Sequence, residues 1–116
     1  MFIETYPDEL ELLNFFEVEP EFSDPIEGKY AYRVSDNNNL TLIFSFAAVE
    51  GWIQTVLEYK GIIIHQCLSE GVKNFNIKDI EKKKYLFSEI IINGIKIEVE
   101  ITINPFILVK WNTLLT

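Results

Sequence analysis

The first 28 residues of this 116-residue chain contain no lysine and no arginine. They carry nine carboxylates, from Glu4 to Glu27, whereas the remaining 88 residues hold nine acids and all ten basic side chains. The formal net charge of −8 therefore belongs to the front of the chain. Such a charge repels phosphate and disfavours nucleic-acid binding, and it favours a basic partner.

Cysteine, histidine and glycine are also scarce. Cys67 is the one cysteine, so an intramolecular disulfide is excluded, and a lone thiol is typical of a reducing compartment. The five glycines are isolated and form no phosphate-cradling loop. The start "MFIETYPDEL" lacks the features of a secretory signal, and no apolar run approaches the roughly 18 residues of a membrane span. We expect a soluble, cytoplasmic protein.

The chain is rich in the hydrophobic and aromatic residues that form a protein core. Hydrophobic residues make up 48% of it and aromatic residues 14%. This composition and length predict a single domain over residues 1–116. Within it we expect an acidic helix plus connector over residues 1–28 and an antiparallel β meander over residues 29–116.

One helix is predicted near the front, in "TYPDELELLNFF". Thr5 is the expected N-cap, with Asp8 three residues later completing an imperfect capping box. Leucine and phenylalanine form a broad apolar stripe, and Pro20 and Pro25 end the helix. The segment "EVEPEFSDPIEG" then reads as a turn-rich connector that packs on the domain through its apolar residues.

The rest of the chain reads as successive strands with tight turns. Lys60-Gly61 and Asn93-Gly94 are two-residue hairpin turns between apolar runs. Neighbouring strands joined by short turns must be antiparallel, because parallel neighbours need long crossovers. The expected fold is mainly β (α+β), with one N-terminal helix packed on a curled antiparallel sheet or partly open barrel of about 7–8 strands. The strands are predicted in "YAYRV", "LTLIFSF", "WIQTVLEY", "IIIHQCL", "VKNFNI", "LFSEIII", "IKIEVEITI" and "FILVKWNTLL".

The segment "IKIEVEITI" predicts a strand with one apolar and one polar face. If Asn93-Gly94 is the turn, then Ile92 faces Ile95 on the apolar side. On the polar side Glu89 meets Glu98, a mildly unfavourable pair of like charges. A neighbouring lysine could offset the repulsion between the two carboxylates, or the face could bind a basic partner. The favoured interpretation is a face whose charges are solvated.

No catalytic set is readable in the chain. His65 and Cys67 share a strand face with Ile63, but no oxyanion donor site accompanies them, so we expect packing positions and no nucleophile pair. One histidine and one cysteine do not make a metal site. Glu98 paired with Glu100 or with Glu89 could do acid–base work only if burial or a like-charged neighbour in a cleft shifted a pKa, and their pattern favours the surface. We therefore predict no enzyme activity, no metal and no cofactor.

The order of parts resembles a family of small immunity proteins that neutralise toxins of bacterial polymorphic and contact-dependent systems. The resemblance rests on the acidic helix with Leu12-Leu13-Asn14-Phe15-Phe16, followed by "LTLIFSF", "IQTVLEYKGIIIHQCL" and a closing "INPFILVKW" that ends at Trp111. It covers about two-thirds of the chain. It implies a binding protein that occludes a toxin's active site or an exosite, often by setting acidic residues against a basic nuclease surface.

Our prediction is an immunity-type inhibitor that binds a cationic toxin domain, a nuclease or another cytoplasmic toxin, through an acidic surface. The alternative is a small-molecule-binding barrel lined by aromatic residues. A protein partner is expected, and no nucleic-acid or membrane partner; the oligomeric state is left open. The expected partner-binding residues are Asp8, Glu9, Glu11, Glu17, Glu19, Glu21, Asp24, Glu89, Glu98, Glu100 and Trp52.

Overall fold

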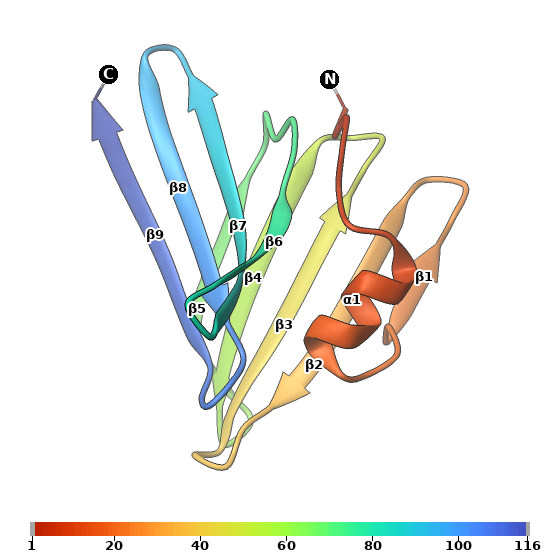
Figure 1. Ribbon diagram of the computed structural model, residues 1–116, viewed down its shortest axis with the longest axis vertical. Coiled ribbons are helices and arrows are strands. Elements are labelled where there is room, and N and C mark those ends of the chain that lie inside the picture. The colour runs from red at the N-terminus through yellow and green to blue at the C-terminus, as the bar shows by residue number, and fades with distance from the viewer. Residues whose placement is uncertain (1, 116) are drawn as a thin grey trace.

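The computed structural model describes residues 2–115, which form one helix and nine strands in two antiparallel sheets (Figure 1). The first sheet has the order β1-β2-β3-β4-β5 and the second β6-β7-β8-β9. Neither sheet closes, so the predicted mainly β class with an N-terminal helix is confirmed, with the strands divided between two layers. The elements are α1 (Glu9–Phe16), β1 (Phe22–Asp24), β2 (Lys29–Ser35), β3 (Leu40–Ala47), β4 (Trp52–Tyr59), β5 (Ile62–Ser69), β6 (Asn76–Ile80), β7 (Lys83–Ile92), β8 (Ile95–Thr102) and β9 (Leu108–Leu115).

Helix α1 and the four-stranded sheet together cover the inner face of the five-stranded sheet (Figure 1). Helix α1 lies over β2 and β3, where the Phe16 ring stacks on Tyr32 at 4.7 Å and lies 5.7 Å from Phe44. The four-stranded sheet lies over the β4–β5 side, where Trp111 Nε1 donates to Thr55 Oγ1 at 3.0 Å. Side chains from α1 and both sheets meet in one buried cluster, which joins the two layers.

The crossing between the layers corrects one predicted strand. We expected "VKNFNI" to be a strand, but the strand begins only at Asn76. Val72 and Phe75 are instead buried in the core as the chain passes from one sheet to the other. The apolar residues of this segment predicted a strand, but they lie in the connection between the two sheets and pack into the core. β7 begins at Lys83, three residues before the predicted strand "LFSEIII".

The helix begins one turn later than predicted. Asp8, and not Thr5, is the N-cap: its Oδ1 accepts from the Glu11 backbone N at 2.8 Å, and Glu11 Oε1 accepts from the Asp8 N at 3.0 Å. This reciprocal pair is a complete capping box. Thr5 is extended and forms a parallel bridge with Asn74. The helix ends at Phe16, before either proline.

The predicted connector contains a short edge strand. β1 pairs with β2, setting Phe22 opposite Ala31 and Asp24 opposite Lys29. Prolines at 20 and 25 bracket this three-residue strand, and proline is tolerated at sheet edges, where no ladder hydrogen bond is lost. The sequence pattern did not predict this strand because two prolines flank it.

The predicted hairpin registers are confirmed. Ile92 pairs with Ile95 and Glu89 with Glu98, and Tyr59 pairs with Ile62 across Lys60-Gly61. One predicted face is wrong. The register of β4 and β5 shifts at Leu57/Glu58, so that His65 pairs with Leu57 but Ile63 pairs with Glu58. Because an extra residue reverses the alternation, Ile63 leaves the face that His65 and Cys67 share.

Replacing Phe16 tests the attachment of α1 to the sheet. Phe16 is 1% exposed, so Phe16→Ala removes a large buried ring and should lower the free energy of unfolding by about 3–5 kcal/mol. Urea unfolding followed by circular dichroism measures the change. Leu10→Ala on the same helix is the matched control, because Leu10 is 65% exposed and should change stability by less than about 0.5 kcal/mol. Equal effects of the two variants would contradict the role given to Phe16.

Candidate functional site

Seven of the predicted partner-binding acids lie on or beside α1 and β1. Asp8, Glu9 and Glu11 occupy the N-terminal end of the helix, and Glu17 is its C-cap. The chain then passes through Glu19 and Glu21 to Asp24 at the end of β1. All but Asp24, which is half-buried, are exposed. We call these seven residues the acidic surface; α1 and β1 lie at one side of the molecule, away from β9 (Figure 1).

Local hydrogen bonds hold several of these carboxylates in place. Glu9 Oε1 accepts from the Tyr30 hydroxyl at 3.2 Å, and Glu17 Oε2 accepts from Asn104 Nδ2 at 3.1 Å. Asp24 Oδ1 accepts from the Glu27 backbone N at 3.4 Å. The acidic surface is therefore built on ordered backbone and does not behave as a charged tail.

Within residues 2–115, none of the acidic residues of the first 28 forms an ion pair. The four ion pairs in this part of the chain use Glu50, Glu58 and, twice, Glu100. Lys29, which pairs with Asp24 in the β1–β2 register, is held by Glu50 at 2.7 Å. The acidic surface thus has no basic side chain paired with it among the described residues.

The Lys29–Glu50 pair shifts both pKa values in the expected directions. The hydrogen bond with Glu50, followed by its negative charge, raises the pKa of Lys29, and weaker contributions come from Glu27 and Asp24. The same hydrogen bond lowers the pKa of Glu50. Both groups are solvent-exposed, so we assign the pair little stabilising effect.

The predicted second group lies elsewhere. Glu89, Glu98 and Glu100 line the outer face of the four-stranded sheet, with Glu89 opposite Glu98 as expected. Glu100 Oε2 is 3.1 Å from Lys83 Nζ and 3.7 Å from Lys110 Nζ, so lysines do relieve part of this face. It is a mixed-charge surface, separate from the acidic surface, and its role in binding stays a prediction.

Trp52, the aromatic residue expected to be exposed, is half-buried at the start of β4. It pairs with Ala47, which pairs in turn with Lys29. These three residues lie side by side at one end of the five-stranded sheet. A hydrogen bond from Trp52 contributes to the lowered pKa of Glu50. Trp52 therefore borders the Lys29–Glu50 pair and does not join the residues of α1.

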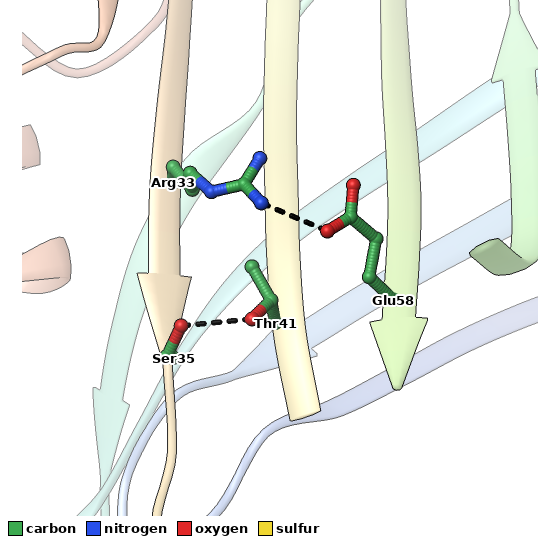
Figure 2. Close-up of polar contacts among 4 residues, drawn as sticks. All are labelled: Arg33, Ser35, Thr41 and Glu58. Carbon is green, nitrogen blue, oxygen red and sulfur yellow. Dashed lines mark hydrogen bonds and ion pairs between the residues drawn. The ribbon is translucent and has the colours of Figure 1, made fainter. Parts of the chain in front are cut away.

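The outer face of the five-stranded sheet carries polar cross-strand contacts that the sequence did not reveal (Figure 2). Arg33 on β2 reaches over β3 to Glu58 on β4 at 2.8 Å, and Ser35 Oγ lies 2.8 Å from Thr41 Oγ1. The Arg33–Glu58 pair joins strands that are not neighbours. It is visible only once the registers of β2, β3 and β4 are combined.

Asp36 fastens the β2–β3 turn to the loop before β9. Its Oδ2 accepts from the Ile107 backbone N at 3.1 Å, and its Oδ1 from the backbone N of Asn38 and Leu40. Desolvation by itself would raise the pKa of Asp36, but the three backbone donors outweigh it and lower that pKa. The residue is structural, and it secures the loop that carries Asn104 beside Glu17.

His65 lies at the contact between the two sheets. Thr55 Oγ1 accepts from Trp111 Nε1 and lies 3.3 Å from His65 Nε2. Burial raises the pKa of the Cys67 thiol, which disfavours the nucleophilic thiolate. Residues 2–115 contain no group of three or more histidine, cysteine or acidic side chains arranged around a metal position. Nor does the described chain contain a helix long and apolar enough to cross a membrane.

Replacing Thr55 tests its place between the sheets. Thr55 is fully buried, and Thr55→Val strands the Trp111 N–H and the His65 ring nitrogen without their partner. We expect a loss of about 1–3 kcal/mol in the free energy of unfolding. Thr113→Val, at an exposed position of β9, is the matched control and should change it by less than about 0.5 kcal/mol. A Thr55→Val protein as stable as the control would contradict this assignment.

Comparison with known proteins gives one informative match. No protein-family model and no curated protein sequence matches this chain. Among solved structures, the chain is similar to the immunity protein chain of a structure described as "Contact-dependent growth inhibition toxin - immunity protein complex from Klebsiella pneumoniae 342". The two share 35% sequence identity with a TM-score of 0.93, over 98% of this chain and 100% of that chain.

Proposed function

The chain belongs to the immunity proteins of contact-dependent growth inhibition systems, and on that premise we propose that it neutralises a toxin domain by binding it and covering its working surface. The observation that carries this proposal is the near-complete structural match, with a TM-score of 0.93 at 35% identity, to the immunity chain of a toxin–immunity complex. Its partner is therefore a protein. It acts in the cytoplasm, as a stoichiometric inhibitor and not as an enzyme.

The acidic surface is the part of this chain that we assign to the toxin. Its carboxylates have no cationic partner among residues 2–115, and an unneutralised array of one sign is costly unless something of opposite sign covers it. A nuclease has a surface of this opposite sign, because the surface that binds nucleic-acid phosphates must be basic. The toxin domain we propose is accordingly a cationic nuclease, and the acidic surface competes with its substrate.

The mechanism combines steering with occlusion. Complementary fields raise the association rate, and close contact then keeps substrate out. No cofactor or nucleic acid takes part. The mixed-charge face with Glu89, Glu98 and Glu100 is given a lesser part, because Glu100 is already shared by two lysines.

A small-molecule carrier is less well supported. The aromatic residues that were to line a barrel cavity pack against one another instead: Phe44 and Phe46 are 0% exposed and 6.0 Å apart. The sheets are not closed into a barrel. The interior that this alternative needs is filled with side chains.

Charge reversal at the acidic surface tests the proposed docking. In Glu19→Lys/Glu21→Lys two exposed carboxylates become cations, so the association rate constant with the cognate toxin domain should fall by about tenfold at low salt. The difference should shrink at high ionic strength, where exposed charges are screened. Stopped-flow or surface plasmon resonance at two salt concentrations measures both effects.

The matched control is Asp79→Lys/Glu81→Lys, which makes the same change in net charge at the exposed end of the β6–β7 hairpin. It should alter the rate far less, because it lies on the other sheet. A wild-type protein that neither binds nor neutralises its toxin would overturn the function itself. Equal effects of the two double variants would overturn the assignment of the acidic surface.

A further inference from the structure

A hollow of about 320 Å³ opens between the start of α1 and the inner face of β2 and β3. Three aromatic side chains form its walls, and two carboxylates lie at its rim. The residues that line it are Tyr6, Pro7, Asp8, Glu9, Leu12, Tyr30 and Phe46.

The aromatic walls are held by the core. The Phe46 ring is fully buried, with Tyr6 at 5.4 Å and Tyr30 at 5.3 Å from its centroid. Tyr6 also stacks on Phe75 at 6.1 Å, although it stays 40% exposed. Two tyrosine faces thus stand at the opening on a rigid base, so that little rotamer freedom is lost when a ligand binds.

The rim supplies negative charge at a defined place. Glu9 Oε1 is fixed by the Tyr30 hydroxyl at 3.2 Å, and no hydrogen bond or ion pair within residues 2–115 engages Glu9 Oε2. Burial first, and then the bond to Glu9, raise the pKa of Tyr30, so this hydroxyl stays a neutral donor. One carboxylate oxygen therefore remains free to accept from a ligand.

The helix dipole does not cancel this charge. An α-helix N-terminus is equivalent to about half a positive charge, whereas three acidic residues stand there: Asp8 at the N-cap, and Glu9 and Glu11 in the first turn. None of the residues that line the hollow is basic. The sign of the site is negative.

We propose that this hollow receives an arginine side chain of the toxin domain, a step that rests on the proposed function and specifies how the acidic surface is engaged. The flat, weakly hydrated guanidinium stacks between tyrosine faces while its N–H groups donate to Glu9 Oε2. Lysine, a compact and strongly hydrated charge, fits this geometry less well. Tyrosine and arginine are also the residues that most often dominate binding energy at protein interfaces.

An arginine probe tests the hollow without the toxin. N-acetyl-arginine amide is titrated into the isotopically labelled protein, with N-acetyl-citrulline amide as its neutral isostere. We expect saturable shifts of the Tyr6 and Tyr30 ring resonances with the arginine probe only. Glu9→Gln, which keeps an acceptor for the Tyr30 hydroxyl, should weaken binding about fivefold or more by removing the charge-assisted bond. Glu81→Gln removes the same charge in the exposed β6–β7 turn, outside the acidic surface, and should bind the probe like wild type.

The outcomes separate the two proposals. Equal shifts with citrulline, or equal losses in Glu9→Gln and Glu81→Gln, would overturn the arginine site even if the toxin binds normally. With the toxin domain, Glu9→Gln should raise the dissociation constant about tenfold and Glu81→Gln much less. If Glu19→Lys/Glu21→Lys weakens toxin binding and Glu9→Gln does not, the acidic surface stands and the hollow is not its anchor. If the toxin does not bind at all, the proposed function fails, and the probe titration still decides whether the hollow takes a guanidinium.

Discussion

The stacking of Phe16 on Tyr32 and Phe44 is the contact on which the functional surface depends. It fixes α1 over the part of the five-stranded sheet that the second sheet leaves uncovered (Figure 1). The capping box then sets where the helix begins, and with it the direction of Glu9. A segment of nine acids would repel itself into disorder without such an anchor, because like charges favour an expanded chain. Buried aromatic area, of order 1.5–3 kcal/mol per large side chain, outweighs repulsion between exposed charges that water and salt screen.

The distribution of ion pairs gives this arrangement its functional meaning. Arg33, Lys83 and Lys110 form ion pairs with Glu58 and Glu100 on the outer faces of the sheets, and Lys29 forms one with Glu50. The chain thus neutralises itself away from its front segment and leaves that segment charged. In an immunity protein, this asymmetry suits a basic partner. A cation that stacks on Tyr6 and Tyr30 would turn a diffuse attraction into a directed contact.

The sequence predicted most of the fold because its strongest signals are local. The Asn93-Gly94 turn and the alternation in "IKIEVEITI" determine a register in which Glu89 meets Glu98. The division into two sheets was missed because it depends on Val72 and Phe75 being buried in a crossover, which looks like strand pattern along the chain. The N-cap was predicted at Thr5 but lies at Asp8, whose capping-box partner Glu11 also stands three residues later in the sequence. The hollow was not predictable, since Tyr6, Glu9, Tyr30 and Phe46 come together only when α1 docks on β2 and β3.

Hydrogen–deuterium exchange of the protein with and without its toxin domain tests the central claim most directly. The account predicts added protection in α1 and in the segment from Glu17 to Gly28, which carry the acidic surface. The rival surface is the edge strand β5, where Ile62, Ile63 and Ile64 are 68%, 57% and 59% exposed. Protection confined to β5 or to the outer face of β6–β9, with α1 and the segment to Gly28 unchanged, would contradict the account.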